Sequence, residues 1–119
     1  MDKVKELIVD AYGCKADLSN ETLLMNKSIE AVQSIGATVA ETASHRFQPH
    51  GLTLCLILKE SHLVLSTWPE YEYATVNIFL CNSGMDPKDC WEFLKKTLRP
   101  EKDILHYVTH DIQKLKKAA

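Results

Sequence analysis

The side chains that could carry chemistry in this sequence lie on segments in which apolar and less apolar residues alternate. Between residues 52 and 81 the alternation has a period of two, which places successive side chains on opposite faces of a β-strand. The less aliphatic set offers hydroxyl, thiol and amide groups, and its members are Thr53, Cys55, Ser66, Asn77 and Cys81. If these strands are neighbours in a sheet, one face of that sheet holds a half-polar site or an interface.

Metal and disulfide chemistry are not indicated. The cysteines are Cys14, Cys55, Cys81 and Cys90, and no two of them have CxxC spacing. This scatter predicts neither a zinc site nor a disulfide framework. We therefore expect no bound metal, and free thiols in a reducing compartment.

A sheet and two helices must position these groups. The alternating segments predict strands over residues 4–12, 38–46, 52–59, 62–68, 74–81 and 104–109. Apolar residues at helical spacing predict a helix from Glu21 to Ser34 that Gly36 ends. Asp86-Pro87 predicts the start of a second helix, because aspartate caps helices and proline favours their first position, and Pro100 stops it.

The order of these elements, βαββ followed by ββαβ, predicts an α+β two-layer sandwich: an antiparallel sheet with both helices on one face. A chain of 119 residues fits a single domain covering 1–119. The second face of such a sheet needs a cover, which favours a homodimer.

Composition limits the classes of partner. Hydrophobic residues make up 45% and charged residues 25%, and the net charge of -2 gives no broad basic surface, so we expect no nucleic acid partner. Met1 is followed by Asp2, Lys3 and Lys5 rather than by a long apolar run, and no window is long enough to span a membrane. We expect a cytoplasmic protein with no membrane segment.

The most specific signal lies in the centre of the sequence. Residues 59–63 read KESHL and residues 67–71 read TWPEY. They are accompanied in order by His45-Arg46-Phe47, Pro49, Gly51, Tyr73-Ala74 and Cys81. Any one of these strings is unspecific, but together they resemble the prokaryotic S-adenosylmethionine decarboxylase family over most of the chain.

The resemblance implies a proenzyme that cleaves itself between Glu60 and Ser61 into a 1–60 chain and a 61–119 chain. In that chemistry the serine hydroxyl attacks the preceding carbonyl and forms an ester, and β-elimination and hydrolysis leave a pyruvoyl group at position 61. The pyruvoyl carbonyl forms a Schiff base with the substrate amine and acts as the electron sink for decarboxylation, so no added cofactor is implied. The implied product is the aminopropyl donor for spermidine and other polyamines.

The resemblance also implies roles for other residues. Cys81 matches the residue that returns a proton to the substrate, a task suited to a thiol. Phe47 matches the position that stacks on adenine and Glu70 the position that binds the ribose hydroxyls, with Trp68 counted among the substrate-binding residues. The family pairs its active sites across a homodimer. Ser61 and Cys81 of one chain are therefore expected to work with Phe47, Thr53, Ser66 and Glu70, which come from the other chain or from across the sheet. Without the resemblance, Ser61 would be read as an ordinary turn serine.

Several positions depart from the family. Thr53 stands where the family has a serine that polarises the scissile carbonyl, and it keeps a hydroxyl. Ser66 replaces a histidine that removes the α-proton, and a serine cannot act as a base near neutral pH. A water or a histidine of a partner subunit remains an alternative for that step. Glu72 replaces a glycine, and Leu80 and Asn82 flank Cys81 where threonine and glycine are common.

These departures leave three interpretations open. The first is an S-adenosylmethionine decarboxylase, which the retained Phe47 and Glu70 favour. The second is a pyruvoyl-dependent arginine or ornithine decarboxylase derived from the same family, in which the added acid Glu72 could favour a cationic substrate. The third is an uncleaved, inactive paralogue that acts as a binding protein. The intact cleavage site and Cys81 argue against the third interpretation.

Overall fold

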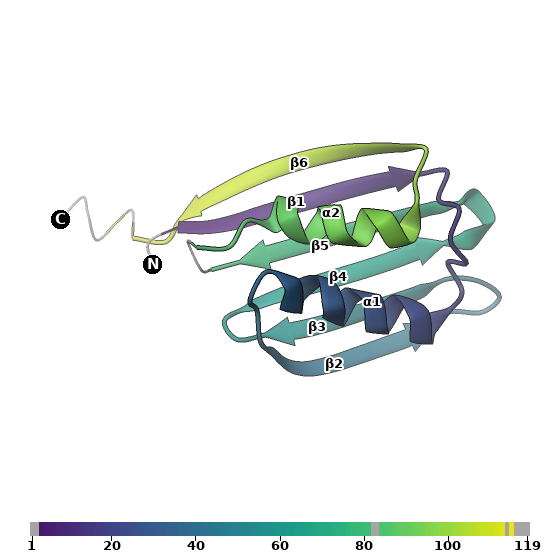
Figure 1. Cartoon of the computed structure of the whole chain (residues 1–119), viewed down its shortest axis with the longest axis horizontal. Helices are drawn as coiled ribbons and strands as arrows, with labels where there is room; N and C mark the ends of the chain where they lie inside the picture. The colour runs from purple at the N-terminus through teal and green to yellow at the C-terminus, as the bar shows by residue number, and fades with distance from the viewer. Residues whose placement is uncertain (1–2, 82–83, 114, 116–119) are drawn as a thin grey trace.

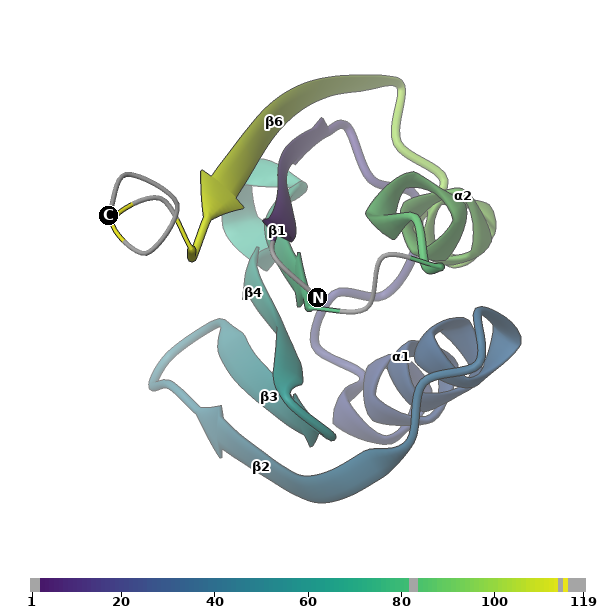
Figure 2. The same cartoon turned by 90° about the vertical axis from the view of Figure 1, so that its left-hand side faces the viewer.

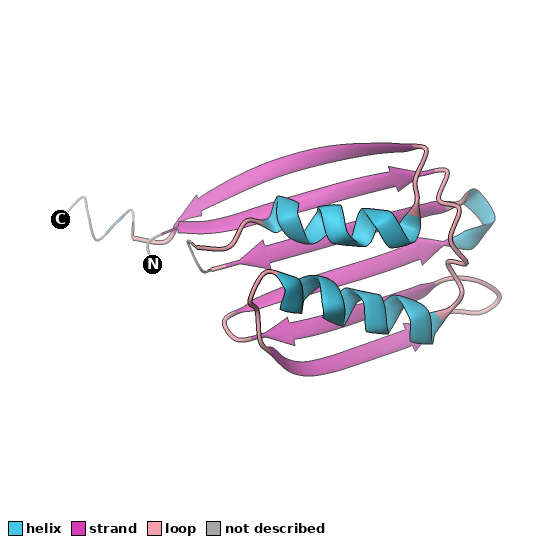
Figure 3. Cartoon of the chain, viewed as in Figure 1, coloured by secondary structure: helices cyan, strands magenta, loops and turns pink. Residues whose placement is uncertain are grey.

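The computed structural model describes residues 3–81, 84–113 and 115, and Figure 1 labels its helices and strands. The chain runs through β1 (Lys3–Tyr12), α1 (Glu21–Ser34), β2 (Val39–Arg46), β3 (Leu52–Leu58), β4 (Ser61–Trp68), the 3₁₀ helix η1 (Pro69–Tyr71), β5 (Tyr73–Leu80), α2 (Pro87–Leu98) and β6 (Lys102–Asp111). Figure 3 shows the same elements coloured by type.

The strands form one antiparallel sheet in the order β2-β3-β4-β5-β1-β6. Helices α1 and α2 both pack on the same face of this curved sheet, as the rotated view in Figure 2 shows. The predicted α+β two-layer sandwich with βαββ-ββαβ order is therefore confirmed. We call the uncovered side of the sheet the open face.

The last strand differs most from its prediction. β6 extends over Lys102–Asp111 rather than 104–109, because it pairs with β1 along its whole length, from Tyr12 opposite Lys102 to Lys3 opposite Asp111. Polar residues occupy both ends of β6, so the side-chain pattern alone did not reveal these backbone pairs. The other strand boundaries agree with the prediction within about one residue.

Both helices begin at a side-chain cap, and the cap of α2 is the one that the sequence predicted. Asn20 caps α1, where its side-chain oxygen accepts a hydrogen bond of 3.1 Å from the backbone N–H of Leu23. Asp86 caps α2 in the same way through a 2.9 Å bond from the N–H of Lys88. These caps satisfy backbone donors that have no partner within a helix.

The core lies between the sheet and the helices. Its largest fully buried side chains include Trp91, Leu7, Leu24, Leu52, Leu54, Leu56, Leu63, Leu65, Ile78, Leu80, Leu94 and Leu98. Full burial of each large apolar side chain contributes about 1.5–3 kcal/mol. The indole N–H of Trp91 donates to Asp103 Oδ2 at 2.8 Å, so the one polar atom of that ring is satisfied. This packed face makes the sheet a rigid support for the residues on its open face.

The open face carries paired polar groups. His110 Nε2 lies 2.9 Å from Glu6 Oε1, and the Asn77 amide donates to the same carboxylate at 2.7 Å. These hydrogen bonds lower the pKa of Glu6, and the bond with His110 has the larger effect. Four residues further along β1, Asp10 accepts a hydrogen bond from Tyr73 and lies beside His106. The open face is therefore half-polar, as the alternation predicted.

None of the described helices is long and apolar enough to cross a membrane. Within residues 3–81, 84–113 and 115, no group of three or more His, Cys, Asp or Glu side chains is arranged to hold a metal ion.

Candidate active site

Ser61 begins β4 directly after a tight turn. Leu58 and Ser61 are paired residues at the ends of β3 and β4, so only Lys59 and Glu60 connect the two strands. Glu60 has a φ of 68°, in the left-handed region. That conformation costs a residue with a Cβ roughly 1–2 kcal/mol. The Glu60–Ser61 peptide bond therefore follows a locally strained residue.

Ser61 and Cys81 lie side by side at this end of the sheet. The backbone N–H of Cys81 donates to Ser61 Oγ at 3.0 Å. Both residues line a pocket of about 280 Å³, the Ser61 pocket, whose other walls are residues 36–38, residues 58–60 and Met85. A hydroxyl oxygen has two lone pairs, so the contact with Cys81 orients Ser61 Oγ and leaves one pair for attack on a carbonyl.

The predicted substrate-binding residues gather at the other end of the sheet. A pocket of about 440 Å³, the Phe47 pocket, is lined by residues 47–51, Thr53, residues 66–68 and Glu70. Phe47 is 49% exposed and Trp68 39% exposed, so these aromatic rings are available to a ligand rather than buried in the core. The structure thus brings Phe47, Trp68 and Glu70 together, as expected.

The two processing positions, Thr53 and Ser66, also lie in the Phe47 pocket. They are opposite residues of β3 and β4, and their hydroxyl oxygens are 2.8 Å apart. The pair can donate hydrogen bonds to a carbonyl oxygen, but neither hydroxyl is a base at neutral pH.

The half-polar neighbourhood predicted from the alternation is only partly formed. Thr53 and Ser66 meet, but Cys81 lies beyond the far end of β5, beside Ser61. Ser61 and Ser66 are five residues apart on β4, roughly 17 Å at the rise of a strand. Within one protomer, the Ser61 pocket and the Phe47 pocket are therefore separate sites.

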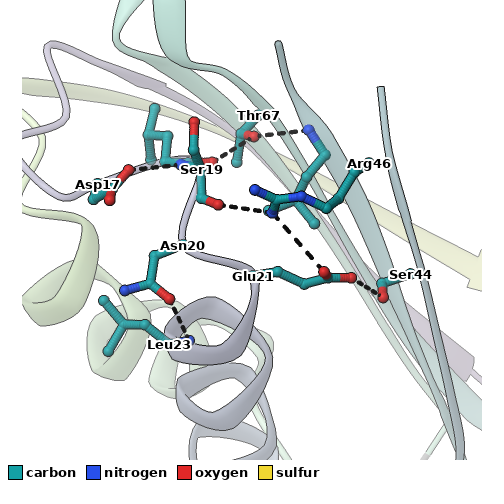
Figure 4. Close-up of polar contacts among 10 residues, drawn as sticks. Asp17, Ser19, Asn20, Glu21, Leu23, Ser44, Arg46 and Thr67 are labelled. Atoms are coloured by element: carbon teal, nitrogen blue, oxygen red, sulfur yellow. Dashed lines mark hydrogen bonds and ion pairs between the residues drawn. The ribbon is translucent and has the colours of Figure 1, made fainter. Parts of the chain in front are cut away.

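The loop that forms the Phe47 pocket is tied to the start of α1 (Figure 4). Arg46 Nη1 donates to the carbonyl of Ser19 at 2.9 Å and lies 3.8 Å from a carboxylate oxygen of Glu21. Ser44 donates to the other oxygen of that carboxylate. Thr67 Oγ1 donates to the carbonyl of Leu18 at 2.9 Å. These bonds hold β2, which leads into the loop, and β4, which lies beside it, against the start of α1.

Gly51 closes this loop. Its carbonyl accepts a 2.9 Å hydrogen bond from the N–H of Phe47, and its φ is +98°. A Cβ at this position would lie 2.9 Å from the carbonyl oxygen of Thr67. Glycine is therefore required here both by the backbone conformation and by the close approach of β4.

Glu72 does not join the Phe47 pocket. It caps η1 with a φ of 52° and lines a separate hollow with Pro69 and residues 14–18. Its carbonyl accepts from the N–H of Cys14 at 2.9 Å. The idea that Glu72 adds negative charge to the substrate pocket is thus not supported. Leu80 is buried in the core, and Asn82 lies outside the described residues.

The remaining cysteines behave as packing residues. Burial raises the pKa of Cys14 to about 11 and that of Cys90 to about 12, which keeps both thiols protonated at neutral pH. Cys55 is half-buried on the open face. Of the cysteines, Cys81 alone lines the pocket that contains Ser61.

One histidine of the Phe47 pocket had no role in the sequence interpretation. His50 lines this pocket together with Ser66. The sequence showed it only as part of a turn between two strands. Its position between Pro49 and Gly51, inside a motif of the recognised family, was the available signal.

Comparison with known proteins gives the context for this arrangement. The model of the S-adenosylmethionine decarboxylase family matches residues 5–111. The chain is 36% identical over 107 residues to the S-adenosylmethionine decarboxylase proenzyme of Thermosipho melanesiensis, covering 89% of this chain and 81% of that protein. It is 35% identical over 108 residues to the proenzyme of Thermotoga maritima, covering 90% and 82%.

Solved structures agree with this match. The crystal structure of the adenosylmethionine decarboxylase from Aquifex aeolicus superposes with a TM-score of 0.74 at 25% identity, over 92% of this chain and 90% of that one. The fold is also shared with the Trypanosoma brucei AdoMetDC-delta26 monomer, with a TM-score of 0.62 at 13% identity, over 97% of this chain and 51% of that one. This chain belongs to the S-adenosylmethionine decarboxylase family.

Proposed function

We propose that this protein is the proenzyme of a pyruvoyl-dependent S-adenosylmethionine decarboxylase, matured by cleavage of its own Glu60–Ser61 bond. One observation carries the proposal. Ser61 follows the left-handed residue Glu60, and its Oγ is held by the N–H of Cys81 at 3.0 Å inside a pocket. Two-residue hairpin turns commonly hold a residue at positive φ, so the feature that an ordinary turn serine would lack is the contact with Cys81 inside a pocket.

The chain's own residues account for the first step of maturation. Attack of Ser61 Oγ on the carbonyl carbon of Glu60 forms an ester as the Glu60–Ser61 amide bond breaks and frees the Ser61 amine. The longer ester connection relaxes the two-residue turn. Release of the strain at Glu60, about 1–2 kcal/mol, favours this rearrangement. The elimination that follows requires a base.

The residues of the Ser61 pocket fit the group that maturation would leave. A pyruvoyl group at position 61 supplies a carbonyl that accepts electrons as carbon dioxide leaves the substrate. Cys81 lies beside that position, where its thiol can return a proton to the substrate. The product would be the aminopropyl donor for spermidine synthesis.

A homodimer would bring the two pockets together. In one protomer the Ser61 pocket and the Phe47 pocket lie at opposite ends of β4. In a two-fold dimer with open faces together, each contact occurs twice, so the Ser61 end of one chain can face the Phe47 end of the other at two equivalent sites. Exposed apolar side chains on the open face, Ile57, Ile104 and Val108, would be covered in such an arrangement.

The Phe47 pocket suits S-adenosylmethionine. Phe47 and Trp68 offer exposed aromatic faces for adenine, and the Glu70 carboxylate can accept hydrogen bonds from a ribose diol. Arginine and ornithine have neither group. The placement of Glu72 in a different hollow removes the feature that favoured those two substrates.

The free thiols are compatible with the cytoplasm as the location of the protein.

The mass of the intact denatured protein tests the maturation. We expect fragments 1–60 and 61–119, the second with a blocked amino terminus, and a single uncut chain for Ser61→Ala. Release of labelled carbon dioxide from S-adenosylmethionine, arginine and ornithine, tested separately, then identifies the substrate. A parent chain that stays whole after long incubation would exclude the enzyme and leave the binding-protein interpretation. Full activity of a monomer in light scattering would exclude the shared site.

A further inference from the structure

The family's maturation chemistry leaves one step of this protein without a residue. The β-elimination removes the α-proton of the ester-linked serine, which calls for a general base within hydrogen-bond reach. Ser66 occupies the position of the family's base, and its hydroxyl is engaged with Thr53 at 2.8 Å. Another group must take the proton.

We propose that His50 is this base and that it acts across the dimer, on Ser61 of the partner subunit. The inference rests on the proposed function, since it concerns the maturation of the same site. His50 lines the Phe47 pocket together with Thr53 and Ser66. Histidine is the side chain most often used as a general base near neutral pH.

Each of the other histidines contacts a partner. The chain has five histidines, and all of them are among the described residues. The ring of His45 packs edge-on against Phe47 with centroids 4.8 Å apart, and the ring of His62 stacks on Phe79 at 4.7 Å. The remaining two, His106 and His110, are paired with carboxylates.

His50 differs from these four because its side chain has no interaction partner among the described residues. It is exposed, and it makes no hydrogen bond, ion pair or ring contact with any residue that the structure describes. Its ring nitrogens are therefore available to a substrate group that enters the Phe47 pocket. A catalytic base needs this availability before its reaction partner arrives.

The backbone around His50 is nonetheless held in place. The loop is closed by the 2.9 Å bond from the Phe47 N–H to the Gly51 carbonyl. Arg46, before the loop, is bonded to the Ser19 carbonyl, and the N–H of Leu52, after it, donates to Thr67 Oγ1 at 3.1 Å. Figure 4 shows Arg46 and Thr67 both reaching the segment that precedes α1. A free side chain on a fixed backbone is a suitable support for a proton acceptor.

The elimination transfers one proton to His50 and breaks one C–O bond. An imidazole nitrogen of His50 takes the proton from Cα of the partner's Ser61, which carries the ester. The released electron pair forms a double bond between Cα and Cβ, the bond from Cβ to the ester oxygen breaks, and Glu60 leaves as a carboxylate. Dehydroalanine remains, and water converts it into the pyruvoyl group and ammonia. Of the Thr53–Ser66 pair, the hydroxyl that does not donate to the other can donate a hydrogen bond to the ester carbonyl.

A blocked elimination can be distinguished from a blocked first step, because hydroxylamine cleaves esters and not amides. In His50→Ala we expect self-cleavage to slow by about 10²-fold or more, the usual contribution of a general base. Hydroxylamine should then release fragment 61–119 with a free serine amino terminus. Lys27→Ala, on α1 and outside both pockets, is the control and should cleave like the parent. His45→Ala tests the neighbouring histidine and should not accumulate ester.

Two further variants test position and geometry. Adding Ser66→His to the His50→Ala chain restores a histidine at the position of the family's base, and this double variant should cleave itself. Its cleavage would also show that the double variant folds. Co-expression of His50→Ala with Ser61→Ala should restore cleavage of the His50→Ala chain, because its Ser61 then faces an intact His50 in the partner.

The outcomes separate the two proposals. If the parent cleaves and His50→Ala cleaves at the same rate, His50 is not the base, whereas the proposed function stands. Loss of cleavage in His50→Ala without hydroxylamine-sensitive ester, or without rescue by Ser66→His, would also overturn the assignment. A parent chain that never cleaves refutes the proposed function and this inference together.

Discussion

Replacing Gly51 with alanine tests whether the loop that forms the Phe47 pocket is as constrained as its geometry indicates. Gly51 has a φ of +98°, and its added Cβ would lie 2.9 Å from the backbone carbonyl oxygen of Thr67. Gly36 is a matched control, since its φ is +90° but the nearest atom to its added Cβ is Met85 Cε at 3.7 Å. The two substitutions share the backbone strain and differ in the clash.

The magnitudes follow from these contacts. The positive φ costs an alanine roughly 1–2 kcal/mol, partly offset by about 0.4–1 kcal/mol from the stiffer unfolded chain. We expect Gly36→Ala to lower the free energy of unfolding by about 1 kcal/mol on this basis. The clash at Gly51 adds about 1–3 kcal/mol, because the Thr67 carbonyl belongs to a paired strand and cannot move freely. For a domain of this size, each kcal/mol corresponds to a shift in Tm of about 4 °C.

The assay is thermal unfolding in a Ser61→Ala background, which keeps every sample a single uncut chain. Gly51→Ala should melt well below Gly36→Ala, and in the cleavable chain it should also weaken substrate binding by displacing Phe47. Equal melting temperatures for the two variants would show that the close approach to Thr67 does not constrain the loop.

Three other predictions follow from individual contacts. Phe47→Ala should raise KM for S-adenosylmethionine about tenfold or more, since stacking of a base on an aromatic ring contributes about 1–3 kcal/mol; an unchanged KM would remove the adenine assignment. Glu6 has a lowered pKa in the folded state, so its stabilising effect is present above its unfolded pKa and is lost as the pH falls through its folded pKa. Glu6→Gln should therefore be less stable than the parent at pH 7 in urea unfolding and should converge with it in acid, whereas a constant difference would contradict the role of the hydrogen bond to His110. Trp91→Phe should destabilise the fold by about 1.5–3 kcal/mol because it removes the hydrogen bond to the Asp103 carboxylate, in addition to the effect of any cavity. A much smaller change in the free energy of chemical unfolding would contradict this prediction.

Local patterns were sufficient to predict most of the architecture. The leucines of β3 recur every second residue, and Asp86-Pro87 carries the cap and the first turn of α2 in adjacent positions. Signals of this kind act over a few residues, so they can be read along the chain. The full length of β6 could not be read in this way, because its polar ends are paired through the backbone of β1.

For the candidate site too, some features could be predicted from the sequence and others only from the tertiary structure. Sequence motifs alone identified the chemistry-bearing residues, because residue type and order mark Ser61, Cys81, Phe47 and Glu70 wherever they lie in space. Only the tertiary structure decided that Ser61 and Phe47 belong to opposite ends of the sheet, and that His50 is free while the other histidines are engaged. The reason is physical: residue identity is local, whereas strand register and side-chain pairing arise from contacts between residues that are distant along the chain.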